Sequence, residues 1–371
     1  MSADSSSFEK GLNLIANILN ERNINELKPY FANLDQPNQE NAVPRGRVAN
    51  IFLILVSEGE LVIRHEGGED ISIARLMDNG YPIILHEKLV SAWRRETLEM
   101  LRHHYDTYKD NVNKIRGKND EWHCYLRPFQ GGGKRTEQKS DVEKQEKSKG
   151  KNEEYIGGLC GECPNCMIFG YAVKDGNYNV KSRIEGDLYF STLPENKSVV
   201  VRTFNAVDET THTTYIPTGG ERTGALFRLS LIKAGTIFVG KVAIKDLSPA
   251  EFLLSLYSLV NTTRIGGVKS DFGKIKVIIP AITLCEHEVS SGYDIFTKVK
   301  DKNDTTEVVR AINSYLSENF KNCKVYTNTD FTPNINNVIK SNENEIIINA
   351  WGDSTNFKKS IEKFVNAKQS P

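Results

Sequence analysis

The chain has 371 residues, of which 39% are hydrophobic and 26% are charged, and its 48 basic residues balance its 48 acidic residues. These values are typical of globular proteins and exclude a collagen-like, coiled-coil or wholly disordered chain. The net charge of zero excludes a uniformly basic coat, although charge can still be concentrated locally. At about 150 residues per domain, this length predicts roughly two domains, or one domain with large insertions.

The amino-terminal sequence MSADSSSFEK has no basic segment followed by an apolar core and a cleavage site, so we expect no secretory signal. No apolar run approaches the roughly 20 residues that a membrane-spanning helix needs. We therefore expect a cytoplasmic protein with no membrane partner.

The first third of the chain predicts a helical extension, a pair of strands and a long helix. Residues 1–43 form the extension, with apolar residues at helical spacing from Phe8 to Leu34. Two β-rich runs, Val48–Ser57 and Glu60–Arg64, flank a Glu-Gly turn and predict a hairpin. Residues 87–108 have the clearest helical spacing in the chain.

The middle of the chain predicts a long insertion, residues 109–170. Within it, residues 130–154 contain a single aliphatic residue, Val142, and alternate in charge sign, so we expect a mobile surface loop. Residues 200–224 include a stretch rich in Thr and Gly that predicts a protruding β-hairpin. The other expected elements are strands at 183–193, 198–205 and 273–284, two strands within 223–242, and a helix at 249–261.

The order of strands and helices over residues 44–284 predicts an α+β, ferredoxin-like core with insertions. Residues 285–371 form a carboxy-terminal α/β extension. There we expect two amphipathic helices around a strand at Glu345–Ala350.

Three of the six cysteines form a Cys-x2-Cys-x2-Cys run, Cys160, Cys163 and Cys166. Thiolates at this spacing, joined by tight turns, can bind one soft ion, and structural Zn²⁺ takes four ligands. We expect the fourth ligand to be Cys124, with His123 as the alternative, because neighbours on an extended segment point in opposite directions. Other interpretations are free buried thiols and a redox or iron–sulfur role.

A second motif is the glycine-rich basic segment 262–274, which follows the helix at 249–261. Adjacent Gly266 and Gly267 would let the backbone approach a phosphate, and three cations would neutralise its charge. The segment lacks the Walker and dinucleotide-binding patterns, so a plain turn is the alternative. The acid-free stretch 222–245 could lie beside it and extend a basic surface.

Two parts of the chain carry a resemblance to a known family. Residues Gly67–Leu101 resemble the glycine loop, strand and following helix of the repeat-associated (RAMP) CRISPR proteins. The run CGECPNCMIFGYAV, together with the later RIGGVKSDFGKIK, resembles the backbone subunit of type I-D CRISPR effector complexes, a Cas-seven-type protein. The resemblance extends over Pro44–Thr283.

This resemblance implies a modified RRM-like (ferredoxin-like) palm with a zinc-bearing insertion and a projecting thumb at 200–224. Copies of such a subunit form a helical filament along a guide RNA (crRNA), beside the other effector subunits, and present the guide to a target DNA or RNA strand. Thumb residues Phe204, His212 and Tyr215 could then wedge between bases. The residues that we expect to contact RNA are Arg45, Arg47, Phe204, His212, Arg222, Arg264, Gly266, Gly267, Lys269 and Lys274.

The resemblance also places Asp70 where RNA-slicing effectors of this superfamily carry a cleaving aspartate. Cleavage would then be either metal-assisted, with Mg²⁺ as a further cofactor, or a geometric scission of the strand, whereas the alternative is that Asp70 only caps a turn. A different class of function is a metal-dependent RAMP endoribonuclease that processes precursor RNA, although no His here has an obvious partner for general-base catalysis. A zinc-ribbon adaptor that binds only protein is a third interpretation.

Overall fold

The computed structural model of the chain describes residues 6–64, 71–76, 79–126, 158–172, 178–205, 215–218, 221–224 and 226–369. The loop expected at 130–154, His212 and Asp70 lie outside these residues. Among the helices described, none combines the length and the apolar character that crossing a membrane requires.

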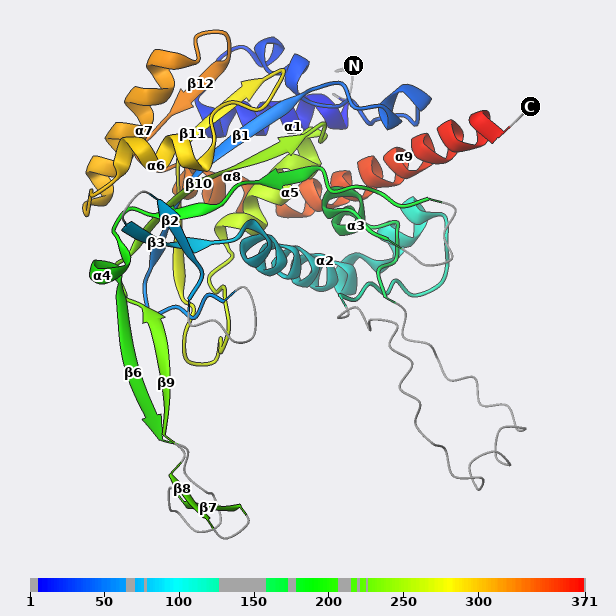
Figure 1. Cartoon of the computed structure of the whole chain (residues 1–371). Helices are drawn as coiled ribbons and strands as arrows, with labels where there is room; N and C mark the ends of the chain where they lie inside the picture. Colours follow the sequence, from blue (N-terminus) through cyan, green and yellow to red (C-terminus); the bar gives the residue numbers. More distant parts are fainter. Residues whose placement is uncertain are drawn as a thin grey trace, which may run out of the picture.

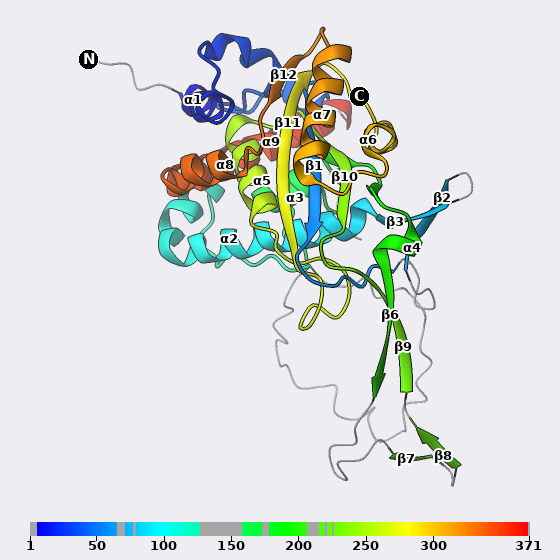
Figure 2. The same cartoon turned by 90° about the vertical axis from the view of Figure 1, so that its left-hand side faces the viewer.

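A central antiparallel sheet organises the molecule, in the order β12-β11-β1-β10-β5-β3-β2, with β4 also paired to β10 (Figures 1 and 2). Its middle strand, β1 (Val48–Ser57), is apolar and buried along almost its whole length because both faces of the sheet are covered. The other strands are β2 (Ile73–Leu76), β3 (Asn79–Ile84), β4 (Ile184–Gly186), β5 (Tyr189–Ser191), β10 (Ile237–Lys245), β11 (Ile275–Cys285) and β12 (Lys324–Thr327).

Side chains of β1 alternate between two cores. Ile51, Leu53 and Leu55 face a large core, whereas Phe52 and Ile54 face a smaller one. On the first face lie α1 (Ser7–Leu19), α2 (His86–Arg116), α5 (Pro249–Val260), α8 (Thr332–Lys340) and α9 (Glu343–Gln369). On the second face lie α6 (Gly292–Val299) and α7 (Thr305–Asn319). The short helices are α3 (Pro164–Phe169) and α4 (Glu195–Ser198), and the 3-10 turns are Ile24–Glu26, Lys28–Tyr30 and Gln39–Ala42.

A two-stranded hairpin projects from one end of the sheet, as Figures 1 and 2 show. It pairs β6 (Val199–Asn205) with β9 (Leu226–Ile232), and a smaller pair, β7 (Tyr215–Thr218) and β8 (Glu221–Gly224), lies beyond it. The thumb expected at 200–224 therefore begins where predicted but returns along β9. Of the strands expected within 223–242, one belongs to this hairpin and the other, β10, to the central sheet.

Two sequence predictions about elements are wrong. Residues 60–64 form no hairpin with β1, because β10 and β11 already occupy both edges of β1; Leu61 instead bridges Ile232 at the base of the projecting hairpin. The strand expected at Glu345–Ala350 is part of α9, since Ile346, Ile347 and Ala350 face the core at helical spacing. Within the expected helical extension, α1 ends at Leu19, where Asn20 adopts the left-handed conformation that closes a helix, and 3-10 turns follow.

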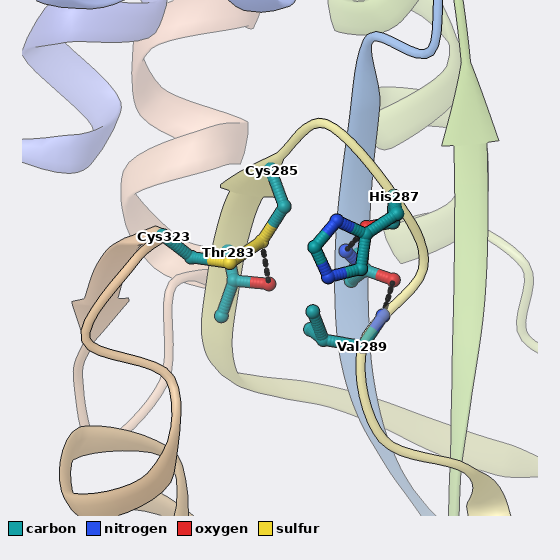
Figure 3. Close-up of a disulfide and its surroundings, with 6 residues drawn as sticks. Thr283, Cys285, His287, Val289 and Cys323 are labelled. Atoms are coloured by element: carbon teal, nitrogen blue, oxygen red, sulfur yellow. Dashed lines mark hydrogen bonds between the residues drawn. A yellow bond between two sulfur atoms is a disulfide. The ribbon is translucent and has the colours of Figure 1, made fainter.

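The two cysteines outside the expected metal site form a disulfide, which the sequence did not predict. Cys285 at the end of β11 is bonded to Cys323, which precedes the edge strand β12 (Figure 3). The sulfur atom of Cys285 lies beside the hydroxyl group of Thr283. The segment that follows β11 is held in turn by the Val289 amide, which donates to Asn50 Oδ1 on β1 at 3.2 Å. The carboxy-terminal extension is thus fastened to the central sheet at this end.

Candidate metal centre and nucleic-acid interface

Four free cysteines converge into one cluster, and the fourth member is Cys124. The sulfur atoms of Cys124 and Cys166 are 3.6 Å apart, those of Cys163 and Cys124 3.8 Å, and those of Cys160 and Cys166 3.9 Å. His123 points elsewhere: its side chain is more than half exposed and its ring stacks on that of a nearby tyrosine. The extended segment thus turns one neighbour inward and the other outward, as the alternation of side chains requires.

The distances between the sulfur atoms fit a metal ion with tetrahedral coordination. With zinc–sulfur bonds of about 2.3 Å, the sulfur atoms of a tetrahedral site lie about 3.8 Å apart, and all four ligand atoms here lie within 4.8 Å of one another. Four thiolates would leave no open coordination position, so the site is suited to a structural role. In the described part of the chain this is the one group of three or more potential metal ligands.

The local electrostatics favour a bound cation. Burial raises the pKa of the Cys163 thiol well above its ordinary value, because a buried thiolate without a partner is costly. Burial also opposes ionisation of Cys160, but hydrogen bonds from the other three cysteines and from Trp122 hold its pKa well below the ordinary value. A divalent cation would supply the positive charge that the remaining thiols need in order to ionise.

The cluster is fixed between α2 and α9. Trp122 Nε1 donates to Cys160 Sγ at 3.4 Å, and the Trp122 ring packs edge-to-face against Trp351 of α9 with centroids 5.1 Å apart. Arg102 of α2 donates to the carbonyl oxygen of Cys124 at 2.7 Å. Hydrogen bonds of this kind orient metal ligands. The Arg102 bond connects the insertion to α2, and the contact between the two tryptophans connects it to α9.

The glycine-rich segment 262–274 folds back on the chain that follows β1. Gly266 has a φ of +83°, and a Cβ atom there would lie 2.4 Å from the carbonyl oxygen of Val62. The Gly267 amide donates to that same oxygen at 2.9 Å. The two glycines thus serve a close approach of backbone to backbone, and the Gly267 amide is already engaged within the protein.

The Arg264 guanidinium closes this segment into a compact loop. Its Nη1 atom donates to the carbonyl oxygens of Lys269 at 2.8 Å and of Phe272 at 2.9 Å. The ring of Phe272 in turn packs edge-to-face on Phe204 at the projecting hairpin, with centroids 6.1 Å apart. The predicted base wedge Phe204 therefore contacts the loop, and the loop and the hairpin form one surface.

Two lysines of the loop lie on this surface together with an arginine that the sequence did not single out. Burial lowers the pKa of Lys269 below its ordinary value, and the positive charge of Arg95 on α2 lowers it further, against the opposing effect of Glu99. Lys274 is more than half exposed and lies 3.3 Å from Glu58. Arg95 is exposed on a helix far away in sequence, so no local pattern could assign it to this loop.

The predicted contacts Arg45 and Arg47 precede β1 and so lie at the end of this strand opposite to loop 262–274. A ten-residue strand is about 30 Å long. Arg45 pairs with Glu40 at 3.1 Å, and Arg47 pairs with Asp246 at 3.4 Å. The structure therefore does not bring these two arginines together with Lys269 and its neighbours.

Among the described side chains of the acid-free stretch 222–245, two lysines that could have extended the basic surface are paired with acids. Lys241 is buried and lies 3.1 Å from Glu288, and Lys245 lies 2.6 Å from the same carboxylate. Glu288 comes from a segment after β11, and the further partners Glu185 and Asp187 come from β4 and the residue after it, so charge counting along the chain could not reveal the pairing. The Arg222 backbone lies in β8, near the tip of the projecting hairpin. Cleavage by Asp70, which lies outside the described residues, stays a prediction.

Comparison with known proteins places these features in a family. A model of the Csc2 CRISPR family matches residues 27–362. No curated protein sequence shows a significant match. The crystal structure of Thermofilum pendens Csc2 is similar in fold, with a TM-score of 0.66 over 92% of this chain and 95% of that chain at 19% identity.

Two more distant structures come from CRISPR RNA-guided surveillance complexes. One is 9% identical, with a TM-score of 0.44 over 79% of this chain and 99% of that chain. The other, described as pre-nicking, is 10% identical, with a TM-score of 0.42 over 73% and 88%. These scores are too low to establish a shared fold. The family match, in contrast, spans most of the sequence, and the chain belongs to the Csc2 CRISPR family.

Proposed function

We propose that this chain is the crRNA-binding backbone subunit of a type I-D CRISPR interference complex. Copies of it would polymerise along the spacer and, with the other subunits, present the guide to a target strand. Family membership supports the link to CRISPR. The observation that carries RNA binding is the position of loop 262–274, Arg95 and the base of the projecting hairpin at one end of the sheet.

The sheet topology supports an RRM-like palm. Along the chain, β1, α2, β5, β10, α5 and β11 follow the order strand, helix, strand, strand, helix, strand. In space the four strands lie in the order β11-β1-β10-β5, all antiparallel. This order is the one expected of a ferredoxin-like core, with the cysteine-bearing insertion after α2 and the projecting hairpin between β5 and β10.

The covered sheet indicates where RNA would bind. RRM domains stack bases on an exposed sheet face, but here α6 and α7 cover one face and α1, α2 and α5 cover the other. Nucleic acid must therefore approach an end or an edge of the sheet. The end from which the hairpin projects offers exposed cations and, on β6, the exposed residues 201–203.

We further propose that the four cysteines hold one structural Zn²⁺. The ion would be bound by Cys124, Cys160, Cys163 and Cys166 and would supply the charge that keeps four thiolates together. Its role is to fix the insertion against α2 and α9, so that the helix bearing Arg95 keeps its position.

Co-expression of the full chain with a repeat–spacer array tests the proposed function. RNA of guide length should co-purify with the wild-type chain, and its yield should fall at least tenfold for the double variant Lys269→Glu/Lys274→Glu. Because phosphate contacts carry no sequence information, the loss should be the same for every spacer, and the salt dependence should flatten. The matched control is Lys321→Glu, an exposed lysine near the disulfide at the other end of the sheet.

Equal RNA yields from the double variant and from Lys321→Glu would mean that this end of the molecule is not the RNA surface. A separate variant, Arg45→Glu/Arg47→Glu, tests the predicted contacts at the far end. Absence of any guide-length RNA from the wild-type preparation would reject the proposed function itself.

A further inference from the structure

Val268, in the glycine-rich loop, has an unusual backbone conformation. Its φ is +47°, in the left-handed region that β-branched residues avoid because the Cβ atom crowds the neighbouring carbonyl oxygen. Elsewhere in the described part of the chain, the non-glycine residues with positive φ are Asn20, Asp246, Ser290 and Asp301. Those residues are all small and polar, and Asn and Asp in particular tolerate this region. Val268 is the exception that needs a reason.

The loop holds Val268 in this conformation through several bonds. The amides of Asp271 and Phe272 both donate to the carbonyl oxygen of Val268, at 3.2 and 3.0 Å. Further along the loop, Arg264 donates hydrogen bonds to the carbonyl oxygens of Lys269 and Phe272. With Gly267 also anchored to Val62, the strained residue cannot relax without breaking the loop.

Packing within the chain does not explain why residue 268 is a valine. The residue is 53% exposed, and it is one of four large hydrophobic residues exposed in the described part of the chain. It belongs to none of the buried clusters, although Phe272 of the same loop does pack against one. Gly or Asn would satisfy the same backbone without strain, so folding alone would favour either of them.

We infer that Val268 is an apolar contact for the face of a nucleotide base in the bound RNA. A strained residue that its surroundings hold in place is characteristic of ligand contacts. Lys269, the next residue, would hold the backbone phosphate, while the valine meets the base and excludes water from it, as apolar wedges do in other nucleic-acid complexes. This inference rests on the proposed function, because it requires RNA at this end of the molecule.

Two substitutions that relieve the strain test the inference: Val268→Gly and Val268→Asn. We expect Tm to stay unchanged or to rise by about 2 °C, while the affinity of the full chain for a labelled single-stranded RNA of mixed sequence falls roughly three- to tenfold. The contact is uncharged, so the slope of log K against log salt should not change. Val268→Leu should retain most of the wild-type affinity.

The control is Val43→Asn, which removes an exposed valine near the opposite end of β1 and should leave affinity unchanged. Lys269→Glu should lower both the affinity and the salt slope. If Lys269→Glu weakens binding but the two Val268 variants do not, the inference is wrong and the proposed RNA surface stands. If none of the three variants changes affinity, the RNA surface itself is wrong. A fall in Tm for Val268→Gly and Val268→Asn would show that the valine serves folding and would also overturn the inference.

Discussion

The adjacent glycines of the loop differ in what a side chain would meet. At Gly266, with φ +83°, an added Cβ would lie 2.4 Å from the Val62 carbonyl oxygen, whereas at Gly267 the nearest atom is a Val62 methyl group at 3.6 Å. We therefore predict that Gly266→Ala lowers the free energy of unfolding by about 2 kcal/mol or more, since it combines left-handed strain with a clash. Gly267→Ala is the matched control and should change stability by about 0.5 kcal/mol or less. Denaturant titration would measure both, and equal effects would contradict this account of the loop.

A buried carboxyl group on α9 makes stability depend on pH. Burial raises the pKa of Asp353 from 3.8 to about 7; the charges of Glu251 and Asp35 add to this effect, whereas a hydrogen bond from Ser248 and the charge of Arg183 oppose it. Between about pH 4 and pH 7 the carboxyl group is therefore protonated in the native state but ionised in the unfolded state. The free energy of unfolding falls as the pH rises through that window.

We predict that Asp353→Asn removes this dependence. Between about pH 5 and pH 8 the wild-type protein should lose roughly 2–3 kcal/mol of stability relative to the variant. The free energy of unfolding changes by about 1.4 kcal/mol per pH unit until the pH reaches the native pKa, and hardly changes above it. Thermal or urea unfolding across this range measures the difference. Ser354→Ala, which removes a neighbouring hydroxyl that donates to Glu251 at 2.8 Å, is the control. Ser354→Ala should lower the free energy of unfolding by a similar amount at every pH, so that the change of stability per pH unit stays that of the wild type. A parallel pH profile for Asp353→Asn and wild type would reject the prediction.

The edge strand β12 is held to the sheet in part by a covalent link. It is four residues long, pairs only with the end of β11, and is preceded by the Cys285–Cys323 disulfide, whose cysteines are 38 residues apart in sequence. Closing a loop of this length is worth about 3–4 kcal/mol in the chain-entropy description. We predict that Cys323→Ser lowers the free energy of unfolding by that amount, as measured by urea titration.

A reducing agent that does not bind metal provides the control. The phosphine-treated wild-type protein should lose as much stability as Cys323→Ser, and the variant should not respond to the treatment. Stability of the variant equal to that of the oxidised wild type would mean that the disulfide contributes nothing at this edge.

At the scale of the whole molecule, the cysteine cluster connects parts that are distant in sequence. The insertion reaches α2 through Arg116, which pairs with Glu162 at 2.7 Å, and reaches α9 through the contact between Trp122 and Trp351. Because both helices also pack against the sheet, loss of the metal should loosen the large core as well as the insertion.

We predict about one zinc per purified chain, and a loss of most of that zinc in Cys163→Ser with a fall in Tm. Metal analysis and differential scanning calorimetry measure the two quantities. Cys323→Ser removes a cysteine outside the cluster, so it should keep the full zinc content. A fully folded chain without metal, or equal zinc content in the two variants, would overturn the zinc site.

The sequence by itself determined what depends on short-range patterns. Helical spacing located α2 and α5, the apolar runs located β1 and β11, and the cysteine spacing identified three members of the cluster. Each of these signals comes from residues within one or two turns of a helix, or within one strand, so no knowledge of the fold is needed.

Tertiary structure decided whatever depends on residues far apart in the chain. The choice of Cys124 over His123, the pairing of Cys285 with Cys323 and the position of Arg95 near Lys269 each follow from how the sheet brings separate segments together. Residues 345–350 show the same limit: their isoleucines suit a strand locally, but the core on the first face of the sheet accepts a helix there. Local propensity differs by a fraction of a kcal/mol per residue, whereas burial of one large side chain is worth about 2 kcal/mol, so packing prevails.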